Sequence, residues 1–147
     1  MTGNALHRFL IVPATISPDA VALIDAPTGL TTTRNELLEE AQAVARQLLK
    51  HGVVAEQRIL ICGLDTKAFL AWFWGAMWIG AIPVPVSTML TGKDYSFLLE
   101  DSRAVGLTFS PGFEEVMREA MLDQPYLKWS QIDGDVPDLV AEIDLGP

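Results

Sequence analysis

This chain of 147 residues contains a single cysteine, Cys62, and two histidines, His7 and His51. One cysteine cannot form an intramolecular disulfide, which argues against a disulfide-stabilised secreted domain and favours a cytoplasmic location. The histidines are far apart in the sequence, and neither has a cysteine or a carboxylate at ligand spacing. We therefore expect no metal site, and we interpret both histidines as surface or capping residues.

Positive charge is also scarce. The chain has 10 lysines and arginines against 19 acidic residues, a net charge of −9. Such a balance argues against nucleic acid or an anionic membrane as the main partner. The first 109 residues are nearly neutral, at −2, whereas residues 110–147 carry nine acidic and two basic side chains. The sequence therefore indicates an apolar body followed by an acidic segment.

Long apolar runs are rare as well. Residues 68–86 are uncharged for 19 positions, which is long enough for a membrane helix. However, Gly80 followed by Pro83 and Pro85 predicts that a helix ends near residue 80 and that the chain then becomes extended. We interpret this run as a buried helix followed by a strand, and we predict no membrane span. The chain also lacks the basic start of a signal peptide.

What the chain does have is a hydrophobic half, 50% of its residues, enough for one domain with a sizeable core. Apolar runs at 58–62, 82–86 and 105–109 predict strands, with helices between them from residue 65 or 66 and from residue 91. An earlier helix begins at a Thr33–Glu36 capping box and ends at Gly52. Alternating strands and helices predict an α/β fold with a mainly parallel sheet flanked by helices.

The remaining elements are shorter. Residues 5–12 fit either a helix or a strand, 21–25 and 128–132 fit strands, and 113–122 fits a helix. The apolar stripe expected on the 33–52 helix consists of Leu37, Ala41, Val44, Ala45, Leu48 and Leu49. We divide the chain into a lead-in (1–19), an α/β subdomain (20–110), and a helix with an acidic tail (111–147).

The sequence contains few candidates for a catalytic motif. Gly75 and Gly80 have the spacing of a phosphate loop, but no lysine follows and the segment is helical, so we interpret them as close-packing points. Cys62 lies within an apolar strand, where a small core residue is expected rather than a nucleophile. The adjacent acidic pairs Glu39–Glu40 and Glu114–Glu115 point apart on their helices and indicate solvated faces.

Five aromatic side chains surround the helix after the first central strand: Phe69, Trp72, Phe73, Trp74 and Trp78. A helix that is apolar on all sides is usually buried, so we favour core packing over an aromatic ligand box. Three tryptophans on one short helix also suggest that a partner domain or subunit covers part of this surface.

Two blocks, Gly80–Val86 (GAIPVPV) and Asp94–Ala104 (DYSFLLEDSRA), resemble the N-terminal part of the adenylate-forming acyl- and aryl-CoA ligases. The similarity extends in one register over about residues 20–110, and its pattern is most like that of benzoate-CoA ligases. The resemblance implies activation of a carboxylate by ATP, with release of pyrophosphate, followed by acyl transfer to the thiol of CoA. ATP, Mg²⁺ and CoA are the cofactors that it implies for an intact enzyme.

The motifs that carry this chemistry in the family do not occur in the 147 residues. They are a Ser/Thr/Gly-rich phosphate loop ending in lysine, an aromatic-Gly-x-Thr-Glu segment, a ribose-binding aspartate and a lysine on a mobile domain. We therefore expect a truncated N-terminal subdomain that is inactive alone and needs no cofactor by itself, and we assign no catalytic residue.

Ser87, Thr88 and Lys93, which follow the strand at 82–86, are our candidates for contact with substrate or CoA, because ligands collect at the carboxyl ends of parallel strands. A strand-end turn and a helix cap are the simpler roles for them. The expected partner is the remainder of a ligase, or a second copy of the chain bound through Trp72, Trp74 and Trp78. The alternative function is a non-catalytic binding or regulatory module, or half of a split ligase.

Overall fold

The computed structural model describes residues 3–133 and residue 145. Its elements follow the expected alternation, and the segment left open at the N-terminus is helical. In chain order they are η1 (His7–Ile11), α1 (Val12–Ile16), β1 (Val21–Ile24), β2 (Thr31–Thr33), α2 (Arg34–Lys50), β3 (Arg58–Cys62), α3 (Lys67–Trp78), β4 (Ile82–Pro85), α4 (Gly92–Ser102), β5 (Gly106–Phe109), α5 (Glu114–Ala120) and β6 (Trp129–Ile132). The acidic tail from residue 134 on lies, except for residue 145, outside the described residues.

The central sheet has four strands in the order β4-β3-β5-β6, and every neighbouring pair is parallel. This confirms the predicted mainly parallel sheet. The chain steps from β3 to β4 on one side and then crosses back to place β5 on the other side of β3. The strand order therefore reverses between β3 and β5, which is where open parallel sheets have their topological switch point.

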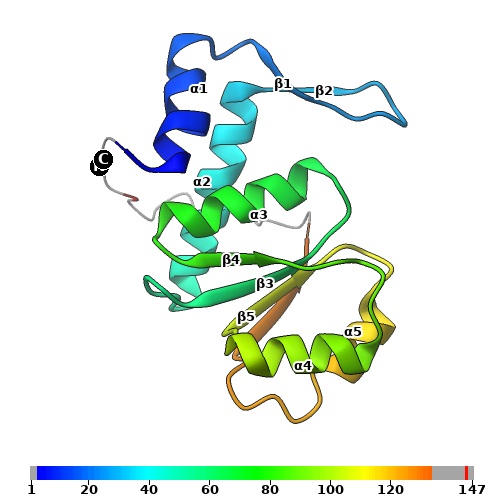
Figure 1. Ribbon diagram of the computed structural model, residues 1–147. Coiled ribbons are helices and arrows are strands. Elements are labelled where there is room, and N and C mark those ends of the chain that lie inside the picture. The colour runs from blue at the N-terminus through cyan, green and yellow to red at the C-terminus, as the bar shows by residue number, and fades with distance from the viewer. Residues whose placement is uncertain (1–2, 134–144, 146–147) are drawn as a thin grey trace.

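Helices cover both faces of the sheet (Figure 1). On one face, α2 and α3 pack on each other and on Ile59 and Ile61 of β3. On the other face, α4 and α5 pack over Leu60 and Leu107. The side chains of β3 thus point alternately into two apolar layers, which explains why this strand has an uninterrupted apolar sequence.

The capping box that we predicted at the start of α2 is present. The Glu36 N–H donates to the Thr33 hydroxyl over 3.2 Å, and the Glu36 carboxylate accepts from the Thr33 N–H over 2.7 Å. The prediction that Leu49 belongs to the buried stripe of α2 is wrong, since this side chain is 37% exposed. Gln47 is buried in the same turn instead, and its side-chain N–H donates to the side chain of Gln131 in β6.

The aromatic helix α3 is a core helix, as predicted. Trp72 is 1% exposed, so it is buried in the subdomain's own interior and is not available to a partner. Gly75 is a close-packing point, because a Cβ there would lie 2.7 Å from Val44 Cβ and 2.8 Å from the Ala41 carbonyl oxygen. Gly80 is not such a point within the helix: it follows α3 with φ of +77°, a conformation that favours glycine and ends helices.

The N-terminal segment covers part of the remaining aromatic surface. Leu6 and Leu10 are buried against α2, and Trp74 and Trp78 pack at the edge of this third apolar cluster. The predicted lead-in therefore contributes to the core. Of the three tryptophans predicted to meet a partner, Trp74 and Trp78 stay partly exposed.

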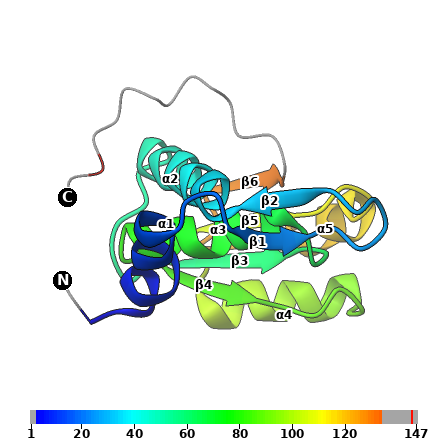
Figure 2. The ribbon, with the colours of Figure 1, turned by 90° about the horizontal axis from the view of Figure 1, so that it is seen from above.

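β1 and β2 form an antiparallel hairpin that stands apart from the main sheet in Figure 1 and lies over it in the view from above (Figure 2). Val21, Ile24 and Leu30 of this hairpin are exposed. A tight turn joins these strands: the Asp25 carboxylate accepts from the backbone N–H of Thr28, and the Asp25 N–H donates to Leu30 O. Within the described part of the chain, no helix is both long and apolar enough to cross a membrane.

Candidate functional site at the carboxyl edge of the sheet

The switch point between β3 and β5 is the place where a sheet of this topology offers a ligand site. Gly63 and Leu64 follow β3 there, and Ser110 follows β5. Asp133 follows β6, the neighbouring strand. Backbone turns and polar side chains from three strands therefore converge at one edge of the sheet.

These groups are joined by a chain of hydrogen bonds. The Leu64 N–H donates to Ser110 Oγ over 2.9 Å, and Ser110 Oγ donates to Asp133 Oδ2 over 2.8 Å. Backbone bonds hold the same strand ends: the Ser110 N–H donates to Cys62 O over 3.1 Å, and the Asp133 N–H donates to Phe109 O over 2.8 Å. These hydrogen bonds thus link the loops that follow β3, β5 and β6 across the switch point.

Burial of this cluster affects the protonation of its carboxyl group. Ser110 is 1% exposed and Asp133 is 7% exposed. Burial raises the pKa of the Asp133 carboxyl above its usual value, and the hydrogen bond from Ser110 works in the opposite direction. The carboxyl consequently takes up a proton at a higher pH than an exposed aspartate does.

Gly63 is required by the close approach of its neighbours. A Cβ at Gly63 would lie 3.0 Å from Cδ2 of Phe69 and 3.2 Å from Asp133 Oδ2. The glycine therefore lets the loop after β3 pass between the first turn of α3 and the carboxyl group.

The predicted ligand contacts lie at the end of β4, an edge strand that is not adjacent to the switch point. Ser87 is exposed, its carbonyl accepts the Tyr95 hydroxyl over 2.7 Å, and its own hydroxyl accepts the Met89 N–H over 3.2 Å. Thr88 is half-buried in the same loop, and Lys93 is exposed in the first turn of α4. Ser87 thus makes the hydrogen bonds of a strand-end turn, and a ligand role for these three residues stays a prediction.

Tyr95 organises that loop from inside the core. Its hydroxyl lies 3.4 Å from Cys62 Sγ, accepts the Leu90 N–H over 3.4 Å, and is fully buried. Burial chiefly raises the pKa of Tyr95 to about 12, and burial likewise raises that of Cys62. Cys62 is therefore an inert core thiol, as the sequence predicted.

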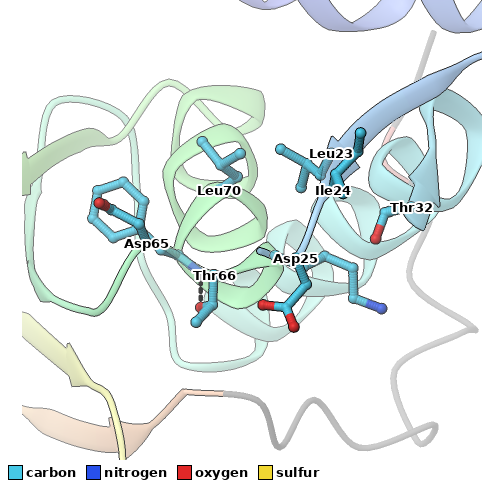
Figure 3. Close-up of a pocket in the computed structure, with 9 residues that line it drawn as sticks. Leu23, Ile24, Asp25, Thr32, Asp65, Thr66 and Leu70 are labelled. Carbon is cyan, nitrogen blue, oxygen red and sulfur yellow. Dashed lines mark hydrogen bonds between the residues drawn. The ribbon is translucent and has the colours of Figure 1, made fainter. Parts of the chain in front are cut away.

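A cleft opens beside the switch point, between the β1–β2 hairpin and the start of α3 (Figure 3). It encloses about 210 Å³. Leu23 and Leu70 face each other across it, with Asp25 and Thr66 at its lower end (Figure 3). Its lining consists of Leu23, Ile24, Asp25, Thr32, Asp65, Thr66, Lys67, Phe69 and Leu70.

The polar lining of the cleft does not fit a phosphate chain. Asp25 and Asp65 supply two carboxylates, and the one cation, Lys67, forms an ion pair with Glu40 on α2. The residues described here also contain no group of three His, Cys, Asp or Glu side chains that could hold a metal ion. His51 instead stacks on Trp129, with ring centroids 4.5 Å apart.

Ser110 and Asp133 were not among the site residues expected from the sequence. Each stands directly after a predicted strand, and this position is the signal that could have identified them. The order of the strands, which brings the ends of β3, β5 and β6 together, was needed to recognise that these two residues meet.

The fold and this edge define the class of the protein: a parallel α/β subdomain with helices on both faces and a polar carboxyl edge at its switch point. Its relatives narrow this class further. The sequence model of the family described as AMP-binding enzyme matches residues 13–138. The chain belongs to this family of adenylate-forming enzymes.

Individual relatives agree with this assignment. The chain is 38% identical over 117 residues to the 4-hydroxybenzoate–CoA/benzoate–CoA ligase of Rhodopseudomonas palustris, covering 80% of this chain and 21% of the relative. It is also similar to the crystal structure of a benzoate CoA ligase from Burkholderia xenovorans, with a TM-score of 0.76, 32% identity, and coverage of 86% of this chain and 25% of that one. The chain therefore spans about a fifth to a quarter of these relatives.

The fold itself matches part of an N-terminal ligase domain. The N-terminal domain of FACL13 from Mycobacterium tuberculosis superposes with a TM-score of 0.84 at 22% identity, over 96% of this chain and 36% of that one. At this identity the similarity concerns the fold alone. The family match and the relatives above 30% identity confirm the resemblance to the N-terminal part of the acyl- and aryl-CoA ligases.

Proposed function

We propose that this chain supplies the N-terminal α/β part of an ATP-dependent acyl- or aryl-CoA ligase that acts on an aromatic carboxylic acid. The 38% identity over 117 residues to a 4-hydroxybenzoate/benzoate ligase is the observation that carries this proposal. The similarity to a benzoate CoA ligase of known structure supports the aromatic substrate class.

The proposed reaction has two steps. A carboxylate attacks the α-phosphate of ATP to give an acyl-adenylate and pyrophosphate, and the thiol of CoA then displaces AMP to give a thioester. Charge that develops on the phosphates must be neutralised by positioned donors and Mg²⁺. The lining of the cleft beside the hairpin offers two carboxylates and an ion-paired lysine, so these described residues do not fit the triphosphate.

We infer that the 147 residues alone do not catalyse adenylation, because their sequence holds no phosphate loop ending in lysine. The test is ATP–pyrophosphate exchange by the purified chain with benzoate and with a fatty acid. We expect exchange no faster than in a sample without protein. Exchange that depends on benzoate and on the chain would overturn the inference of inactivity.

We further propose that Trp74, Trp78 and the neighbouring Phe73 contact the remainder of such a ligase. These side chains are partly exposed on α3, and Phe73 and Trp74 stack edge to face, 5.3 Å apart. Size-exclusion chromatography at several concentrations tests the rival partner, a second copy of the chain. A monomer is expected, and a dimer that Trp74→Ala abolishes would favour self-association instead.

We also propose a cytoplasmic location, on the strength of the single, buried cysteine.

A further inference from the structure

The hydrogen bonds at the switch point connect a titratable group to a loop. We propose that Asp133, Ser110 and the Leu64 amide form a proton-operated clasp that ties the start of α3 to the ends of β5 and β6. The proposal concerns this subdomain by itself and does not depend on the ligase function.

The geometry places one hydroxyl between a carboxyl group and a backbone amide. Ser110 has a single hydroxyl proton, which it gives to Asp133 Oδ2 over 2.8 Å, while its oxygen accepts from Leu64 N over 2.9 Å. An ionised carboxylate is the stronger acceptor, and it polarises the hydroxyl so that the oxygen accepts more strongly in turn. The protonation state of Asp133 is thereby transmitted to the Leu64 amide.

The surroundings of Asp133 leave the carboxyl dependent on Ser110. From β3, the titratable group that faces it is the Cys62 thiol, whose pKa is raised by burial and, to a smaller extent, by the Asp133 charge. From α3, Phe69 packs at Gly63 beside the carboxyl oxygen.

The Leu64 amide lies close in sequence to the residues that line the cleft. Thr66, two residues after Leu64, is the N-cap of α3, and its hydroxyl accepts the Phe69 N–H over 3.3 Å. Asp65, Thr66 and Lys67 then line the cleft beside the hairpin. A change in the Leu64 hydrogen bond therefore reaches the segment that forms one wall of the cleft.

The experiment follows the carboxyl carbon of Asp133 and the amide of Leu64 by NMR, using the full chain, from acidic to neutral pH. We expect both signals to titrate with one common midpoint above the usual aspartate value of 3.8. Amides of the loop at residues 87–91, at the far edge of the sheet, serve as an internal control and should not share this midpoint. A Leu64 amide that does not follow Asp133 would overturn the proposal.

Two variants separate transmission from simple packing. In Ser110→Ala, the midpoint of Asp133 should move to higher pH, because the bond that lowers its pKa is lost, and the Leu64 amide should stop responding. Ser110→Thr keeps a hydroxyl and should preserve the response. An Asp133 midpoint in Ser110→Ala that is unchanged or lower would contradict the clasp. If Ser110→Ala does not fold, the test consists of the wild-type titration and of whether the Leu64 amide of Ser110→Thr still follows Asp133.

Discussion

Thr108, in the middle of β5, has a fully buried hydroxyl for which the described part of the chain offers no hydrogen-bond partner. Its neighbour on the same face, Gln131 of β6, pairs with Gln47 instead. A buried polar group without a partner costs about 1–3 kcal/mol by mutational measurements. This single unpaired hydroxyl therefore lowers the stability of the folded chain.

We accordingly predict that Thr108→Val raises the free energy of unfolding by about 1 kcal/mol, since it removes the unpaired hydroxyl and keeps the branched shape. Urea denaturation followed by tryptophan fluorescence measures the change. Thr31→Val, at an exposed position of β2, is the matched control and should have little effect. Loss of stability in Thr108→Val would show that the hydroxyl is bonded after all, for example to an internal water.

In contrast to Thr108, Tyr95 has a buried hydroxyl that both donates and accepts a hydrogen bond. It donates to Ser87 O over 2.7 Å and accepts the Leu90 N–H, so it fixes both sides of the loop after β4. Tyr95→Phe should lower the free energy of unfolding by about 1 kcal/mol, because the Ser87 carbonyl and the Leu90 N–H lose their hydrogen-bond partner. Tyr126→Phe, at a 41% exposed position, is the control for removal of a tyrosine hydroxyl. Equal effects of the two substitutions would contradict the role given to Tyr95.

At the scale of elements, the contact between α2 and α3 shows two physical effects in competition. Glycine within a helix costs about 1 kcal/mol relative to alanine, so helix propensity alone predicts that Gly75→Ala is stabilising. However, the new Cβ would lie 2.8 Å from the backbone oxygen of Ala41, which cannot rotate away. Overpacking of this kind costs about 1–3 kcal/mol.

We therefore predict that Gly75→Ala lowers the thermal midpoint of unfolding, measured by circular dichroism. Gly92→Ala is the matched control. Its Cβ would lie 2.5 Å from Glu119 Oε2, the flexible end of an exposed side chain that can move aside. It would lie 3.1 Å from Glu119 Cβ, a contact that a small shift relieves and that involves no backbone atom. A stabilising effect of Gly75→Ala would mean that α2 and α3 are not in close contact at this point.

Most elements could be predicted because their signals are local. The capping box of α2, the apolar run of β3 and the proline-containing β4 are each determined by adjacent residues. Leu49 was misplaced because Gln47 is buried through a bond to Gln131, which is distant in the sequence. The pairing of Ser110 with Asp133 could not be predicted for the same reason, since it depends on the order of the strands.

At the scale of the whole molecule, Asp133 makes stability depend on pH. Its pKa is raised in the folded state above the usual value of 3.8, so between these two values the folded chain holds a proton that the unfolded chain has released. The contribution of Asp133 to stability is therefore present at low pH and is lost as the pH rises through the raised pKa.

Asp133→Asn should abolish this dependence. Its stability relative to the wild type should increase as the pH rises through that window, as measured by urea denaturation at a series of pH values. Asp101→Asn makes the same change in net charge at an exposed position and controls for general electrostatics. A wild type and an Asp133→Asn variant with parallel pH profiles would contradict the assignment.

The most direct test of the proposed function is a chimera in which this chain replaces its 117-residue match in the Rhodopseudomonas palustris ligase. The measurement is benzoate-dependent ATP–pyrophosphate exchange by the purified chimera. If the chain supplies the N-terminal part of an aromatic acid–CoA ligase, the chimera retains exchange. A chimera that folds with the circular dichroism and thermal midpoint of the parent but shows no exchange would contradict the account.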